Sequence, residues 1–264
     1  MQLGLRGRVA IVTGGSQGIG RAIASSLAAE GANLAICSRR DGPLQETAAE
    51  LRAAGADVVA IAMDVTDPGA AAELVDATVG HFGRLDILVN NAGKGHPKPI
   101  LKQDRDDWSE ALELNLLSAV RLSTACIPHM REQGWGRIVN ISSRVAREPD
   151  PYFAPYSASK AALMSYTKSL AEAFSKDGVL TNCVVPGLIR SEAVDQAAEK
   201  SAAATGKTAD EVMKEMRRRR PIPAGRLGEP EDVAGVVTLL CSEAASWMTG
   251  GSINVDGGMT RSWT

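Results

Sequence analysis

Three residues near the middle of the chain, Ser143, Tyr156 and Lys160, are of types that together could transfer a proton. A free tyrosine has a pKa of about 10, so it exchanges protons poorly at neutral pH unless a positive charge stabilises its phenolate. Lys160 follows Tyr156 by four residues, so both side chains would share one face of a helix starting near Pro155. The Ser143 hydroxyl could hold a carbonyl or alcohol oxygen beside the phenol. A lone Tyr-x-x-x-Lys pair is more often a surface pair, so the chemistry depends on the surrounding segments.

The first segment that could position such a site is a glycine-rich turn, TGGSQGIG, at residues 13–20. It follows a continuous apolar run at residues 8–13, which predicts a strand buried on both faces, and it precedes a segment with the apolar spacing of a helix. Glycines at positions 14, 18 and 20 would let the backbone turn tightly and approach a pyrophosphate. A glycine turn without a ligand is the alternative, but the order of strand, turn and helix favours a dinucleotide cofactor.

The second predicted strand, residues 33–38, ends in Ser38, Arg39 and Arg40. Dinucleotide-binding folds place the adenosine ribose at this point, where an acidic residue would accept a hydrogen bond from its 2′-hydroxyl. This chain offers a hydroxyl and two guanidinium groups instead, which suit a 2′-phosphate. We therefore expect NADP(H) to be favoured over NAD(H), although a solvated arginine pair at the start of a helix is the alternative.

Strand and helix patterns alternate along the chain. Strands are predicted at residues 8–13, 33–38, 58–62, 85–90, 137–142, 179–185 and 252–255, and helices after the glycine turn and at 44–54, 70–82, 108–130, 155–176 and 229–242. The alternation predicts the α/β class: a single-domain Rossmann-type doubly wound parallel sheet of about seven strands, with helices on both faces, over residues 1–264. Residues 190–225 break the alternation and are predicted to be a substrate-loop insertion that closes over the cleft.

Polar residues at the predicted strand ends have two interpretations each. Asp64 could bind the adenine amino group or cap the next helix, and the amides at positions 90 and 91 could satisfy loop backbone or line a cofactor cleft. Asn115 lies on a mostly apolar stretch, LELNLLSAV, and a buried asparagine must find hydrogen-bond partners. It is either a satisfied core amide or a polar group aimed at a site.

The composition is that of an ordinary globular protein: 264 residues, 44% hydrophobic and 23% charged, with a formal net charge of -2. This balance predicts neither a nucleic-acid nor a membrane partner, and no apolar run has the roughly 18 residues of a membrane span. The four cysteines show no C-x-x-C spacing and the three histidines no metal-ligand spacing, so we expect reduced, buried thiols and no metal. No signal peptide is visible at the N-terminus, which favours a cytoplasmic location.

The segments TGGSQGIG, NNAG, Asn115, Ser143, YSASK and PGLIRS, in this order and spacing, resemble the short-chain dehydrogenase/reductases over about residues 5–258. The most similar branch contains the 3-oxoacyl-carrier-protein reductases and related NADP-dependent ketone and alcohol oxidoreductases. The resemblance implies a homotetramer formed through the helices that carry Asn115 and Tyr156.

By this resemblance, Tyr156 donates a proton to the substrate oxygen during reduction, and Ser143, rather than Ser142, hydrogen-bonds that oxygen. Lys160 would bind the nicotinamide ribose and lower the pKa of Tyr156, while Asn115 would hold a water that relays protons to Lys160. The expected cofactor-binding residues are Gly14, Ser16, Gln17, Gly18, Ile19, Gly20, Ser38, Arg39, Asp64, Val65, Asn91, Ala92, Gly93, Tyr156, Lys160, Pro186, Gly187, Ile189 and Ser191.

The favoured hypothesis is an enzyme that transfers a hydride between NADP(H) and a small-molecule carbonyl or secondary alcohol, with Tyr156 as proton donor or acceptor. One alternative is a reductase of 3-oxoacyl thioesters specifically. Another is a cofactor-binding regulator without catalysis, although a binding protein has no physical need for the Tyr156 and Lys160 pair. The three-residue gap between this pair argues against an epimerase or an enoyl reductase. The substrate and the direction stay open, because the loops around the predicted pocket follow no simple rule.

Overall fold

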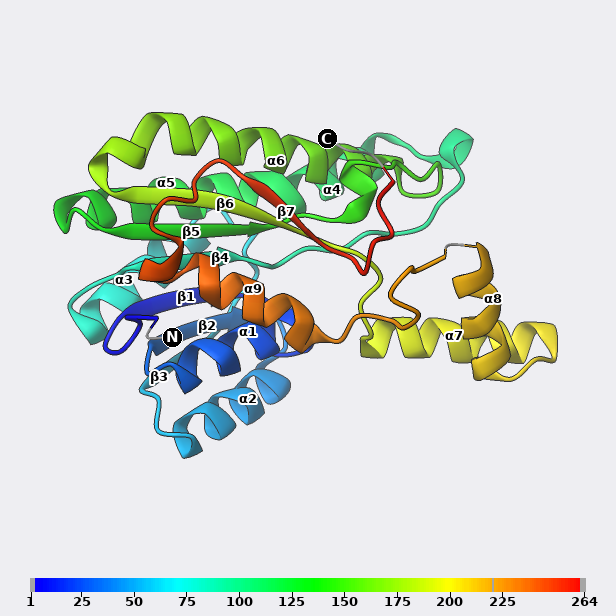
Figure 1. The fold of residues 1–264 in the computed structure, drawn as a ribbon, viewed down its shortest axis with the longest axis horizontal. Helices are drawn as coiled ribbons and strands as arrows, with labels where there is room; N and C mark the ends of the chain where they lie inside the picture. Colours follow the sequence, from blue (N-terminus) through cyan, green and yellow to red (C-terminus); the bar gives the residue numbers. More distant parts are fainter. Residues whose placement is uncertain (1–2, 220, 262–264) are drawn as a thin grey trace.

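Seven parallel strands form one sheet in a computed structural model that describes residues 3–219 and 221–261, and Figure 1 shows its arrangement. The strands are β1 (Val9–Thr13), β2 (Asn33–Ser38), β3 (Val58–Ala62), β4 (Ile87–Asn90), β5 (Gly136–Ile141), β6 (Val179–Pro186) and β7 (Ser252–Val255). Their order is β3-β2-β1-β4-β5-β6-β7. The predicted doubly wound parallel sheet is thereby confirmed.

The order of the strands reverses between β1 and β4, which pair in parallel with Val12 opposite Val89. Every residue of β1, β4 and β5 is buried, as the continuous apolar runs predict for strands covered on both faces. Chain connections leave such a reversal point in opposite directions, so a crevice opens beyond the carboxyl ends of these strands. The fold therefore places a ligand site where the glycine turn and Ser143 lie.

Helices cover both faces of the sheet (Figure 1). One face carries α1 (Gly18–Ala29), α2 (Asp41–Ala53) and α9 (Pro230–Leu240), and the other carries α3 (Ala70–Phe82), α5 (Ser118–Glu132) and α6 (Ala154–Phe174). Two apolar clusters fill the space between sheet and helices, one including Ile23 and Val237 and the other Leu74 and Leu122. All four cysteines are buried and free, as expected.

The predicted helix at 108–130 is wrong as a single element, because the structure divides it at Asn115. Helix α4 (Arg105–Leu112) passes into a π-helical turn, η2 (Glu113–Leu117), before α5 begins. The Asn115 side chain donates hydrogen bonds to the carbonyl oxygens of Ala111, at 2.9 Å, and Lys94, at 3.1 Å. A side-chain amide that competes for a helix carbonyl widens the local turn, and such π-turns are frequent at functional sites.

The segment predicted to be an insertion forms two helices, α7 (Glu192–Thr205) and α8 (Ala209–Arg219), which we call the α7–α8 hairpin. In Figure 1 this hairpin projects from the edge of the molecule where the strands end. Ser191 caps α7 by accepting a hydrogen bond from the Val194 N–H, at 3.3 Å. The run of four arginines extends to Arg220, which lies outside the described residues.

No helix in residues 3–219 or 221–261 is both long and apolar enough to cross a membrane. The same residues contain no group of three or more histidine, cysteine, aspartate or glutamate side chains that could hold a metal ion.

Candidate active site

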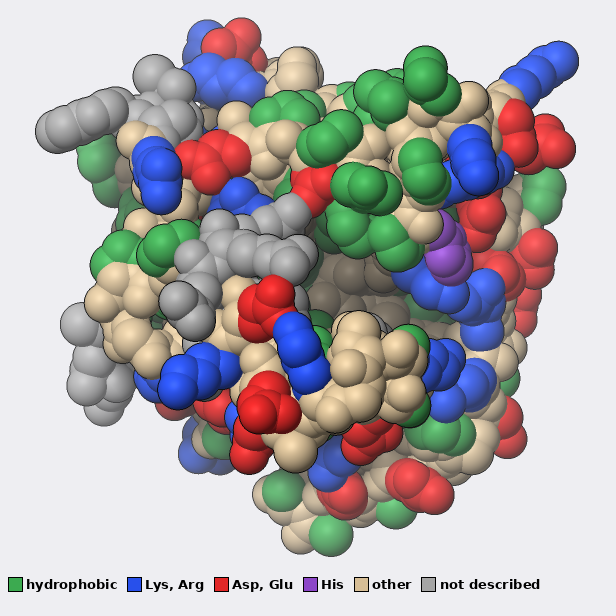
Figure 2. All heavy atoms as spheres, turned by 90° about the vertical axis from the view of Figure 1, so that its right-hand side faces the viewer, with side chains coloured by type: hydrophobic (Ala, Val, Ile, Leu, Met, Phe, Trp, Pro, Cys, Tyr) green, Lys and Arg blue, Asp and Glu red, His purple; other side chains and the backbone are tan. Residues whose placement is uncertain are grey.

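The predicted chemical residues lie together at the carboxyl edge of the sheet. Ser143 follows β5, Tyr156 and Lys160 lie on the first turns of α6, and Asn115 lies on the π-turn η2. Figure 2 shows this face of the molecule, which is hollowed near its centre. Four side chains from three separate elements therefore converge on one cleft.

Ser143 and Tyr156 face each other through their hydroxyl groups. Burial raises the pKa of Tyr156, and a side-chain hydrogen bond with Ser143 opposes this rise without cancelling it. The Lys160 ammonium lies 5.8 Å from the centroid of the Tyr156 ring. The Lys160 charge is not among the causes of this shift, so the expectation that Lys160 lowers the pKa of Tyr156 stays a prediction.

Lys160 is almost completely buried, at 2% exposure. Its Nζ donates a hydrogen bond to the Ile141 carbonyl oxygen at 2.8 Å, and its own carbonyl oxygen accepts one from Ser142 Oγ at 2.9 Å. Ser142 thus fixes the helix that carries Lys160, while Ser143 reaches Tyr156. The two neighbouring serines therefore make different contacts, and the expectation that Ser143 binds the substrate oxygen stays a prediction.

Burial lowers the pKa of Lys160 from 10.5 to about 8, against a smaller opposing effect of Cys183. Below pH 8 Lys160 is protonated in both the folded and the unfolded chain, and the folded state carries the cost of burying its positive charge. Between pH 8 and 10.5 only the unfolded chain still binds it, so unfolding becomes less favourable as pH rises. We expect the unfolding free energy of wild type, relative to Lys160→Met, to rise by more than about 1 kcal/mol across this window. Urea denaturation at both ends of the window measures it, and a constant difference would contradict the lowered pKa.

Asn115 and Lys160 meet at Gly93. The Asn115 Oδ1 accepts a hydrogen bond from the Lys94 N–H at 2.9 Å, which holds the loop after β4 against the π-turn. A Cβ placed on Gly93 would lie 2.7 Å from Asn115 Oδ1 and 2.9 Å from Lys160 Nζ. Only glycine permits this approach, so the NNAG segment is part of the site rather than a neighbouring loop.

Thr13, the first residue of the glycine turn, joins the turn to the NNAG segment, and no sequence pattern indicated this role. Thr13 Oγ1 accepts hydrogen bonds from the backbone N–H groups of Asn91, at 3.0 Å, and Ala92, at 2.9 Å. A Cβ on Gly20 would lie 2.1 Å from the Gly14 carbonyl oxygen, and Gly14 has a φ of 65°. The turn is therefore closed too tightly for side chains at these two positions, as a pyrophosphate-binding turn requires.

Arg39 and Asp64 lie at the carboxyl ends of β2 and β3. Arg39 is largely exposed, with Nη1 at 3.8 Å from Asp64 Oδ2, whereas Arg40 hydrogen-bonds Gln17. Burial raises the pKa of Asp64, but hydrogen bonds from Thr66 and the charge of Arg39 lower it further than burial raises it. Asp64 Oδ1 accepts from the Thr66 N–H at 3.0 Å, so its carboxylate forms a local turn and does not cap α3, which begins at Ala70.

The residues expected on the nicotinamide side follow β6. Gly187 lies against Asp256, since a Cβ on Gly187 would be 2.7 Å from the Asp256 Cα. Ile189 forms a parallel bridge with Gly228, which joins the start of the α7–α8 hairpin to its end. Pro186 closes β6, and Ser191 caps α7, so these predicted residues lie in the one short segment that joins β6 to α7.

Gly95 also belongs to the site, and no sequence pattern pointed to it. A Cβ on Gly95 would lie 2.9 Å from Cγ of Tyr156 and 3.1 Å from Cδ1 of Phe153. The two aromatic rings pack edge to face with centroids 6.5 Å apart. The missing side chain thus lets the loop after β4 rest directly on the Tyr156 ring.

Gly95→Ala should displace the Tyr156 ring and lower kcat by about 10- to 100-fold, because small errors in the position of a reacting group are costly. Gly80→Ala on α3, where a Cβ meets nothing within 4 Å, is the matched control and should leave kcat unchanged. Steady-state rates for both variants make the comparison, and equal rates would show that the Tyr156 ring tolerates the added methyl group.

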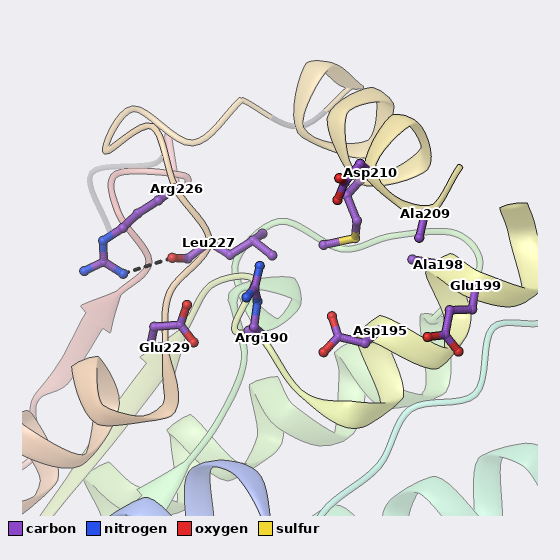
Figure 3. Close-up of a pocket in the computed structure, with 10 residues that line it drawn as sticks. Arg190, Asp195, Ala198, Glu199, Ala209, Asp210, Arg226, Leu227 and Glu229 are labelled. Atoms are coloured by element: carbon purple, nitrogen blue, oxygen red, sulfur yellow. Dashed lines mark hydrogen bonds between the residues drawn. The ribbon is translucent and has the colours of Figure 1, made fainter. Parts of the chain in front are cut away.

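A cavity of about 400 Å³ lies between the α7–α8 hairpin and the loop before α9 (Figure 3). Arg190, Asp195 and Glu199 project into it from the hairpin side in Figure 3, and Arg226 and Glu229 come from the loop. None of the residues around this cavity is one of the four that converge near Tyr156. It is therefore a feature of the hairpin base, separate from the hydroxyl pair.

Comparison with known proteins agrees with this geometry. The family model described as enoyl-(acyl carrier protein) reductase matches residues 14–260. An uncharacterized oxidoreductase of Mycobacterium tuberculosis is 37% identical over 96% of this chain and 92% of its own length. A 3-oxoacyl-[acyl-carrier-protein] reductase of Vibrio cholerae is 35% identical over 97% of this chain and 99% of its own length.

Among solved structures, L-sorbose reductase from Gluconobacter frateurii, complexed with NADPH and L-sorbose, superposes with a TM-score of 0.95. It is 36% identical in sequence, and the match covers 99% of this chain and 100% of that one. Because the family model, the relatives and this structure all cover nearly the whole chain, the chain belongs to the short-chain dehydrogenase/reductase family and is an NAD(P)-dependent oxidoreductase.

Proposed function

We propose that this protein is an NADP(H)-dependent carbonyl reductase in which Tyr156 exchanges a proton with the substrate oxygen. The observation that carries the proposal is the placement of Ser143 at the end of β5 next to Tyr156, whose ring centroid lies 5.8 Å from the Nζ of buried Lys160. Two hydroxyl groups that face each other can both contact one carbonyl oxygen. A carbonyl reduction needs this arrangement, since negative charge develops on that oxygen.

The nicotinamide ring, when bound, supplies a hydride from C4 to the carbonyl carbon. Ser143 holds the carbonyl oxygen, and Tyr156 donates its proton to the same oxygen as the C–O bond becomes single. Tyr156 is protonated at neutral pH, as a tyrosine with its ordinary pKa of about 10 would be, so it has a proton to donate in reduction. Lys160 passes a proton back to Tyr156, and Asn115, whose Oδ1 lies with Lys160 Nζ next to Gly93, holds the water that relays a proton to Lys160.

The preference for NADP(H) rests on the end of β2. Arg39 is exposed there, and its Nη1 lies at a long 3.8 Å from Asp64 Oδ2, so its guanidinium can turn to a 2′-phosphate. Ser38 Oγ lies close enough to hydrogen-bond the Arg40 carbonyl, at 3.2 Å, and is available at the same point. The L-sorbose reductase structure holds NADPH, which supports the same choice.

We propose a polyhydroxylated or otherwise small free ketone as the substrate, with the α7–α8 hairpin as the lid that closes over it. The solved relative that binds L-sorbose has the same fold over almost every residue. The homotetramer and the cytoplasmic location expected from the sequence stay predictions, and light scattering in solution tests the first.

Reduction of a 3-oxoacyl thioester is the second candidate, favoured by the Vibrio cholerae relative. One assay separates the candidates: NADPH oxidation followed by absorbance against sugar ketones, simple ketones, 3-oxoacyl thioesters and an enoyl thioester. We expect turnover with a free ketone. Turnover with the enoyl thioester alone would reject a carbonyl reductase. NADPH binding without oxidation of any substrate would favour the non-catalytic regulator.

A further inference from the structure

The chain segment after β7, residues 256–261, is folded against the cleft; we call it the C-terminal segment. The Asp256 carboxylate accepts hydrogen bonds from the backbone N–H groups of Gly258, at 2.9 Å, and Thr260, at 2.8 Å. Met259 is buried, with 7% of its surface exposed. These contacts give the C-terminal segment a fixed shape and an apolar anchor.

One end of the C-terminal segment reaches the loop that holds Ser143. Glu148 Oε1 accepts a hydrogen bond from the backbone N–H of Arg261 at 2.6 Å, and Glu148 Oε2 accepts one from Arg144 Nη1 at 3.1 Å. Arg144 directly follows Ser143 in the chain and begins the short helix η3 (Arg144–Ala146). A single carboxylate therefore joins the C-terminal segment to the turn that presents Ser143.

The other side of the C-terminal segment reaches the chain that returns from the α7–α8 hairpin. The Ala224 N–H donates a hydrogen bond to the Gly257 carbonyl oxygen at 2.9 Å. A Cβ on Gly257 would lie 2.9 Å from Ile222 Cγ2, and one on Gly258 would lie 3.1 Å from Pro223 Cγ. The two glycines thus let the C-terminal segment lie directly on the returning chain.

We propose that Glu148 is a positioning residue that, through the C-terminal segment, holds the Ser143 turn and the base of the α7–α8 hairpin in one fixed arrangement. The proposal rests on the proposed function, in which Ser143 binds the substrate oxygen and the hairpin covers the substrate. A carboxylate suits this role because its two oxygens accept from two different partners at once, one of them a guanidinium. A glutamine would present an NH2 donor in place of one carboxylate oxygen, so one of the two partners would face a donor instead of an acceptor.

Two pairs of variants test this link. Glu148→Gln removes one acceptor at almost constant volume, and Glu172→Gln is its control, since Glu172 forms an exposed pair with Lys168 on α6. Arg261→Pro deletes the backbone N–H that Glu148 accepts, whereas Arg261→Ala keeps it. If Glu148→Gln does not fold, the Arg261 pair tests the same hydrogen bond at an exposed position.

In the NADPH complex, trypsin should cleave the hairpin at Lys200, Lys207 and Lys214 about 5-fold faster in Glu148→Gln and Arg261→Pro than in their controls. The KM for the ketone should rise by about 10-fold and kcat should fall by a smaller factor, because both depend on Ser143, while NADPH affinity should stay nearly unchanged because the cofactor site is not altered. A variant that was merely destabilised would lose NADPH affinity as well. Equal cleavage rates in the variants and their controls would overturn the link. Cleavage needs no turnover, so a wild type that reduces no carbonyl would reject the proposed function instead.

Discussion

Tyr156→Phe should lower kcat by about 10²- to 10⁴-fold, the usual contribution of a positioned general acid, while NADPH binds almost as tightly as before. The substitution removes only the hydroxyl that faces Ser143, and the ring keeps its edge-to-face packing on Phe153. The fall in kcat therefore reports the loss of the proton donor and not a change in packing. Steady-state kinetics with the ketone that the substrate assay identifies gives kcat, and NADPH titration by fluorescence gives the cofactor affinity.

Tyr166→Phe is the matched control for this experiment. Tyr166 lies on the same helix, α6, and its hydroxyl hydrogen-bonds Thr124 and Ser123 instead of facing the cleft. Its removal should leave kcat within about twofold of wild type, since it touches no reacting atom. Wild-type turnover in Tyr156→Phe would show that another group, such as a water held near Asn115, delivers the proton.

The architecture could be predicted from the sequence because its determinants are local. The strands at residues 33–38, 58–62 and 252–255 and the helix at 70–82 have the predicted bounds, since each is a continuous apolar run or an amphipathic repeat between turn residues. The position of Ser143 just beyond the carboxyl end of a strand could also be predicted, and it follows β5 in the structure.

Features that depend on partners distant in the chain could not be foreseen in this way. Asn115 lies in a π-helical turn that interrupts a continuous apolar pattern, and its side-chain amide donates a hydrogen bond to the Lys94 carbonyl oxygen in the loop after β4. Gly95 matters only because Tyr156 and Phe153 lie opposite it, and nothing in its own neighbours indicates this. Burial raises the pKa of Tyr156, and sequence spacing indicates which charge is near but not how deeply the phenol is buried.

Arg39→Asp should reduce kcat/KM with NADPH by about 100-fold and leave that with NADH unchanged or higher. A charge-assisted hydrogen bond contributes about 1.5–3 kcal/mol, which corresponds to roughly 10- to 150-fold in affinity, and an aspartate would also repel the 2′-phosphate. The carboxylate introduced by Arg39→Asp would accept a hydrogen bond from the 2′-hydroxyl of NADH at the same point. Kinetics with each cofactor at saturating ketone measures the change in preference.

The position of the charge, and not the net charge, is what this prediction concerns. Arg105→Asp makes the same change at the start of α4, which packs near α6 and not beside β2, and should not alter the cofactor preference. Arg40 provides a second comparison, because its guanidinium already hydrogen-bonds Gln17 in the glycine turn. If Arg40→Asp changed the preference more than Arg39→Asp, the 2′-phosphate would bind on the glycine-turn side of β2. Salt should weaken the effect of the responsible arginine, since the contact is exposed and charge-based.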